Sequence, residues 1–160
     1  MTALIVVFIT LSLMGSALWI VPPKQERRRM ALRMLARKHG LTVQLTSIEL
    51  PDKWDKSKEK HKSCGYGFYR AKPVQEMTEK TLLLKHEIWK YQVITTGWWA
   101  NAALLLSEQD QKDLAILHDS VTAIEITRDA VIAYWHEGGA EVEVEVMGRL
   151  LPSLAKCSSK

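Results

Sequence analysis

The sequence lacks the short motifs that mark common catalytic sites. It contains no G-x-G-x-x-G or P-loop glycine pattern, no H-E-x-x-H zinc pair and no G-x-S-x-G nucleophile turn. Its five histidines are scattered, and none has a serine or cysteine together with an acid at motif spacing. The sequence therefore predicts no catalytic residue and no cofactor. It favours a non-enzymatic function. One alternative is a membrane-tethered enzyme whose reaction no motif identifies.

Cysteine is almost absent too. Cys64 and Cys157 are far apart and show no C-x-x-C spacing, so they do not form a disulfide framework and are expected to be free thiols in a reducing compartment. His61-x-x-Cys64 could supply two metal ligands, but no second pair lies at ligand spacing. The sequence predicts no metal site.

Charge is missing from residues 3–21, which are followed at once by Pro22-Pro23 and a run of basic residues. Nineteen uncharged residues at helical rise span about 28 Å, close to the hydrocarbon core of a bilayer. A cleaved signal peptide would need a basic segment before the run, where only Met1 and Thr2 stand. The pattern predicts an uncleaved transmembrane helix over 3–21, with Trp19 at the headgroup level.

Lysine and arginine follow this run and are absent before it, so the positive-inside rule places the N-terminus outside and residues 24–160 in the cytoplasm. The predicted location is a bacterial inner membrane, crossed once. Ser12, Gly15 and Ser16 form a small-residue face on which another membrane helix could pack. The alternative is that these residues simply face lipid.

Residues 22–40 predict a basic juxtamembrane helix ended by Gly40. Its cations close to the expected membrane exit favour contact with anionic lipid headgroups, and the alternative is a helix packed on the following domain. The expected headgroup ligands are Lys24, Arg27, Arg28, Arg29 and Arg33.

Residues 41–156 predict a cytoplasmic α+β domain with a small, mainly antiparallel sheet and two helices. Residues 41–48 alternate as a strand, 51–63 form a lysine-rich polar loop with Trp54, and 64–70 form a second strand. The clearest hairpin turns at Arg128-Asp129, with Ile126 opposite Val131. A capping box at Ser107 begins a helix, and residues 141–155 favour a terminal helix over a strand.

Two further patterns bear on partners. Gly65-Tyr66-Gly67-Phe68 is similar to the core of the RNA-recognition strand motif, but the preceding basic residue and the companion aromatic strand are missing, so we expect no nucleic-acid binding.

Trp98 and Trp99 cannot both point inward from an extended segment, so one is expected to be free to dock a partner.

The start of the chain, an apolar helix followed by Pro22-Pro23-Lys24-Gln25-Glu26 and Arg27–Met30, resembles YajC, the small accessory subunit of the bacterial preprotein translocase. Residues 41–54 and 126–135 resemble uncharacterised single-span proteobacterial inner-membrane proteins. These resemblances imply an inner-membrane location and no site residue.

Together the patterns predict an accessory or adaptor subunit of an inner-membrane complex, partnered by other membrane helices and anionic lipid. The alternative is a membrane-surface domain that binds anionic lipid.

Overall fold

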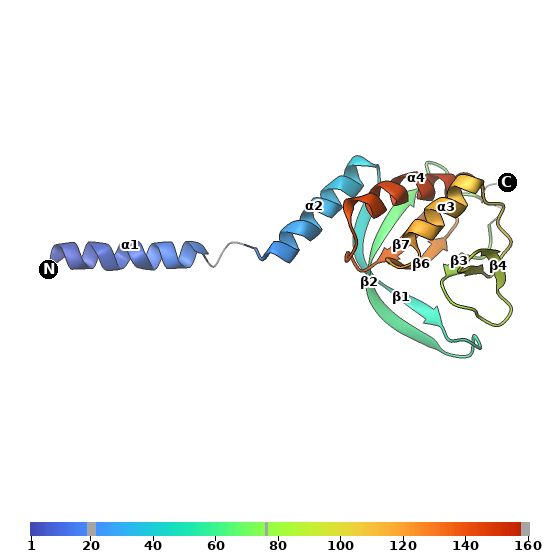
Figure 1. The fold of residues 1–160 in the computed structure, drawn as a ribbon, viewed down its shortest axis with the longest axis horizontal. Helices are drawn as coiled ribbons and strands as arrows, with labels where there is room; N and C mark the ends of the chain where they lie inside the picture. The colour runs from blue at the N-terminus through green and yellow to red at the C-terminus, as the bar shows by residue number, and fades with distance from the viewer. Residues whose placement is uncertain (19–21, 76, 158–160) are drawn as a thin grey trace. The chain divides into compact units, whose positions relative to one another are not determined.

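A computed structural model describes residues 1–18, 22–75 and 77–157 (Figure 1). The chain divides into two compact units, Met1–Ala31 and Leu32–Lys160. Helix α1 (Thr2–Leu18) belongs to the first unit, and helix α2 (Lys24–Lys38) runs from the first unit into the second. This division differs from the predicted boundary at residue 40, because Leu32 and Ala36 of α2 are already buried in the core of the second unit.

Helix α1 corrects the predicted membrane span. It has 17 residues, Thr2–Leu18, and a helix of that length extends about 26 Å, less than a hydrocarbon core of about 30 Å. Among the described residues no helix combines the length and the apolar character needed to cross a membrane. The prediction of a transmembrane helix over 3–21, and of a single-pass protein, was therefore wrong. Residues 19–21, with Trp19, lie outside the described residues.

The second unit is α+β, with a seven-stranded antiparallel sheet in the order β1-β2-β7-β6-β3-β5-β4. Helices α3 (Glu108–Leu117) and α4 (Glu141–Cys157) cover one face of this sheet (Figure 1). The strands are β1 (Thr42–Pro51), β2 (Lys58–Tyr69), β3 (Thr81–Leu84), β4 (Gln92–Thr95), β5 (Trp98–Ala100), β6 (Val121–Ile126) and β7 (Ala130–Trp135).

The alternation of side chains along each strand sorts the apolar residues into two cores. In β7, Val131, Ala133 and Trp135 belong to the larger core beneath the helices. Ile132 and Tyr134 point the other way, into a smaller core. That second core is completed by Ile88, from the segment between β3 and β4, and by two residues of β1, Ile48 and Leu50.

Several local predictions are confirmed. Ile126 pairs with Val131 in the β6–β7 hairpin. Ser107 caps α3 in a full capping box with Asp110. Gly40 follows α2 with a φ of +76°, the left-handed conformation that favours glycine after a helix. Residues 141–157 form a helix that continues through Pro152.

The lysine-rich loop was assigned wrongly. Residues 58–63 belong to β2, which pairs with β1 without interruption from Lys58 opposite Pro51 to Gly67 opposite Thr42. Lysines stand at every second position from 58 to 62, which is the alternation of a strand. The prediction of a loop had relied on the polar composition of the segment alone. Only the turn at 52–57 is irregular.

Trp98 is a central residue of the larger core. Its side chain is fully buried, and the indole Nε1 donates a hydrogen bond of 3.0 Å to the carbonyl oxygen of Leu114 in α3. The indole thereby joins the short strand β5 to the helix layer. Trp99, next in the strand, is half-buried.

Replacing Trp98 with Phe should destabilise the protein by about 2 kcal/mol, because the change removes buried volume and leaves the Leu114 carbonyl without its donor. Urea unfolding followed by far-ultraviolet circular dichroism measures this loss. Trp99→Phe is the matched control and should cost less than about 1 kcal/mol. Equal losses in the two variants would contradict the assigned role of Trp98.

Candidate functional site

The predicted lipid-headgroup residues fall into two groups. Lys24, Arg27 and Arg28 are exposed on α2 in the first unit. Arg27 donates to the carbonyl of Pro22 over 3.1 Å. Arg29 is half-buried and donates to Glu26 over 3.2 Å. Arg33 belongs to the second unit and has a different environment.

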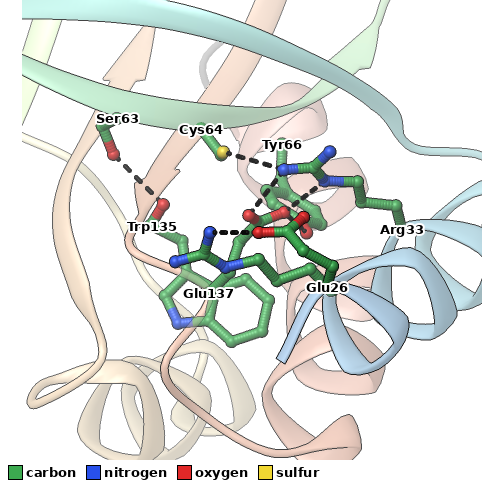
Figure 2. A network of polar contacts seen from close by, with 8 residues as sticks. Glu26, Arg33, Ser63, Cys64, Tyr66, Trp135 and Glu137 are labelled. Carbon is green, nitrogen blue, oxygen red and sulfur yellow. Dashed lines mark hydrogen bonds and ion pairs between the residues drawn. The ribbon is translucent and has the colours of Figure 1, made fainter. Parts of the chain in front are cut away.

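Arg33 is held by a buried carboxylate (Figure 2). Its Nε and Nη2 atoms donate to the two oxygens of Glu137 over 2.6 and 2.7 Å. The hydroxyl of Tyr66 donates to the same carboxylate over 2.9 Å, and the Sγ atom of Cys64 lies 3.7 Å from Arg33 Nη2. Tyr66 also packs edge-to-face against Trp135. The cluster connects α2, β2 and the residues after β7, so we assign it a structural role.

The protonation states support that role. Burial alone raises the pKa of Glu137, but hydrogen bonds from Arg33 and Tyr66 outweigh it and hold the pKa below its usual value. Burial raises the pKa of the Cys64 thiol, and a protonated, buried thiol is a poor nucleophile. The cluster therefore contains the ionised carboxylate of Glu137, whose oxygens already accept hydrogen bonds from Arg33 and Tyr66. Its thiol, Cys64, is a poor nucleophile. The cluster does not supply an acid–base or nucleophilic pair.

The other predicted site residues are placed as follows. Ser12, Gly15 and Ser16 are exposed on α1, and the Ser16 hydroxyl donates to the Leu13 carbonyl over 2.9 Å. Their packing against another helix stays a prediction. Trp98 is buried and hydrogen-bonded, so its side chain presents no surface to a partner.

A second cluster lies at the end of the β1–β2 hairpin, where Asp52 organises the turn. Its Oδ1 atom accepts hydrogen bonds from the backbone N–H groups of Trp54 and Lys56, at 3.1 and 2.8 Å. Its Oδ2 atom accepts from the Ser57 hydroxyl at 2.9 Å. These bonds, first that from Lys56, lower the pKa of Asp52. The turn leaves the Trp54 side chain 58% exposed.

The segment between β3 and β4 completes this cluster. The N–H of Trp89 donates to the carbonyl of Lys53 over 3.0 Å, which fixes one turn against the other. Ile88 is buried in the smaller core, whereas the Trp89 indole is 57% exposed. The ammonium of Lys90 lies 4.4 Å from the centroid of the Trp89 ring, a cation–π contact. Burial and the nearby charge of Asp55 raise the pKa of Tyr91, consistent with close packing of the two turns.

We call residues 52–62 and 85–90 the aromatic–basic tip. It holds seven lysines and four carboxylates, a net charge of +3. Its lysines are Lys53, Lys56, Lys58, Lys60, Lys62, Lys85 and Lys90. Since successive strand residues alternate, Lys58, Lys60 and Lys62 lie on one face of β2. The tip thus combines two exposed indoles with a concentration of cations.

Backbone strain coincides with both clusters. Among the described residues, positive φ angles outside glycine occur at Asp55 (+55°), Lys90 (+74°) and Glu137 (+57°). Such a conformation costs a non-glycine residue about 1–2 kcal/mol. The surrounding hydrogen bonds hold these residues in place: Asp55 and Lys90 in the tip, Glu137 in the ion pair.

The tip was only partly visible in the sequence. The lysine-rich stretch with Trp54 was recognised, but Trp89 lies 35 residues beyond Trp54 in the chain. Its partner is identified only by the hydrogen bond between residues 53 and 89. No sequence signal pairs those two turns.

Within the described part of the chain, no three His, Cys, Asp or Glu side chains are grouped so as to hold a metal ion. No family model, curated protein or solved structure matches the chain. The resemblance to the translocase accessory subunit therefore stays a prediction.

Replacing Glu137 with Gln should lower the free energy of unfolding by about 2 kcal/mol at neutral pH, because Arg33 loses a charged partner while remaining partly solvated. The pKa of Glu137 is lower in the folded protein than its ordinary value of 4.5, so its stabilisation is complete above that pH and is lost as the pH falls through the folded value. Urea unfolding from pH 7 to pH 3 should show the difference between wild type and Glu137→Gln shrinking in acid.

Asp129→Asn is the control. Asp129 pairs with Arg128 at 3.6 Å, and both side chains are more than half exposed. That change should cost less than about 0.5 kcal/mol. A Glu137→Gln variant as stable as wild type at pH 7 would contradict the stabilising role.

Proposed function

We propose that this protein is a non-enzymatic domain that binds anionic lipid surfaces through its aromatic–basic tip. The observation that carries the proposal is the pair of tryptophans, Trp54 and Trp89, exposed on two hydrogen-bonded turns among lysines. The predicted cytoplasmic leaflet of a bacterial inner membrane would offer such a surface, because that leaflet is anionic.

The chemistry of the tip suits a lipid interface. Indole rings are amphipathic and collect at the headgroup level, where the ring meets hydrocarbon and the N–H meets water. Each lysine near an anionic surface contributes about 1 kcal/mol. The ring of Trp89 and the ammonium of Lys90 can act together there, since the ring would lie below the phosphates while the ammonium stays among them.

Anionic lipid is favoured over nucleic acid by shape and composition. Single-stranded nucleic acid is held in a positive groove that follows its backbone. The tip is built from two turns and contains no arginine. Exposed loop tryptophans fit a flat, deformable interface better than a polymer groove.

The first unit supplies a second set of cations, Lys24, Arg27 and Arg28, exposed on α2. They support the predicted headgroup contact for that segment, whereas Arg33 is committed to Glu137. An accessory-subunit function remains compatible with lipid binding. Its predicted docking residue would be the half-buried Trp99, because Trp98 is buried.

The double variant Lys53→Gln/Lys90→Gln should bind vesicles containing phosphatidylglycerol about 30-fold more weakly, because two lysines worth about 1 kcal/mol each are lost. A chain beginning at Lys24 suits the assay, since helix α1 (Thr2–Leu18) contributes no residue to the buried core. Co-sedimentation at low salt measures the affinity, and added salt should release the protein.

The matched control is Lys72→Gln/Lys112→Gln, which removes two exposed lysines outside the tip. It should bind nearly as wild type does. Equal weakening of both double variants would show general charge attraction without a site. Binding of single-stranded RNA but not of vesicles would reject lipid as the ligand.

Insertion of the indoles gives a separate prediction. Phosphatidylglycerol brominated in its acyl chains should quench the fluorescence of wild type on binding, and Trp54→Phe/Trp89→Phe should lose most of that quenching. Trp99→Phe, which changes a half-buried indole away from the tip, should retain it. Unchanged quenching in the double variant would place the tip outside the interface.

A further inference from the structure

One edge of the sheet is long, regular and open. Strand β1 ends the strand order, and its ten residues, Thr42–Pro51, pair with β2 alone in unbroken register. Alternate residues of such a strand direct their N–H and C=O groups away from the sheet. An unpaired row of these groups is a template for another strand.

Proteins usually protect such an edge with charge, proline, a bulge or a very short strand. The opposite edge strand, β4, has four residues and a register shift. By contrast, β1 carries no charge from residue 42 to 48, and its only proline is its last residue. Leu45, at the middle of this uncharged stretch, is 78% exposed.

We infer that the open edge of β1 pairs antiparallel with β1 of a second copy of this chain, about a two-fold axis at Leu45. This inference does not depend on lipid binding. The pairing places Leu45 opposite Leu45, Val43 opposite Ser47 and Gln44 opposite Thr46. It removes the exposed leucine from water and satisfies the outward backbone groups of both strands.

The uncharged stretch explains why the partner is a second copy. Antiparallel self-pairing at Leu45 puts Glu49 beside Leu41 of the other copy, so no like charges meet. A foreign peptide added to a sheet edge gains specificity from pockets beside the strand. The cavity that includes Thr42, Gln44 and Thr46 lies on one face of the sheet and extends over Gly65 and Gly67 to β7, so it is not a pocket along the outer edge. The outer edge therefore selects its partner through backbone pairing and the side chains opposite each other. A second β1 meets both requirements.

The geometry also sets the arrangement of the pair. Each β1 runs toward the turn at residues 52–57, which belongs to the aromatic–basic tip of its own copy. Antiparallel pairing therefore places the two tips at opposite ends of the shared sheet. A single strand pair lies at the small end of protein interfaces, so the association should be weak and micromolar.

The test uses the full chain in mild detergent, followed by sedimentation equilibrium over about a hundredfold range of concentration. Wild type should show a monomer–dimer equilibrium. Leu45→Lys should weaken the dimer at least tenfold, because the axis places the two ammonium groups opposite each other. Leu105→Lys, at a 91% exposed leucine outside the sheet, is the matched control and should dimerise as wild type.

A charge-swap experiment tests the register. Leu45→Glu alone should also be monomeric, and mixing it with Leu45→Lys should restore a dimer containing one copy of each. A monomeric wild type would overturn the inference, as would a dimer unaffected by Leu45→Lys or a mixture that stays monomeric. Circular dichroism spectra matching wild type confirm that each variant is folded.

Discussion

The width of the sheet relative to its helical cover is the constraint on which the rest of the structure depends. Seven strands at about 4.8 Å spacing extend about 30 Å, whereas each helix covers about 10 Å. Helices α3 and α4, with the second half of α2, bury the middle of one face. The β1–β2 hairpin extends past them (Figure 1). Residues 58–62 of β2 are exposed there, whereas Ile48 and Leu50 of β1 are buried in the smaller core.

The buried ion pair and the tip show two uses of charge in one small domain. Glu137 is surrounded by donors, so its negative charge is balanced internally and stabilises the junction of α2, β2 and the end of β7 (Figure 2). Six of the seven lysines of the tip are exposed, Lys85 is half-buried, and together they exceed the carboxylates beside them. A charge satisfied within the fold contributes to stability, whereas an unbalanced exposed set favours an oppositely charged surface.

The proposed lipid site and the proposed self-pairing edge lie on the same hairpin but use different groups. The tip acts through side chains at the turn, and the edge acts through the backbone and Leu45. Because antiparallel pairing directs the tips apart, the dimer would carry a lipid-binding end on each side of a continuous sheet.

The sequence by itself determined the elements whose signals are local. The capping box at Ser107, the hairpin at Arg128-Asp129 and the glycine that ends α2 all depend on residues within a few positions of one another. Tertiary structure decided the rest. It buried Trp98 against Leu114, drew Arg33 to Glu137 across 104 positions, and joined Trp89 to Lys53. Those contacts arise because the strands are adjacent in space and not in sequence, and neither periodicity nor composition encodes strand order directly.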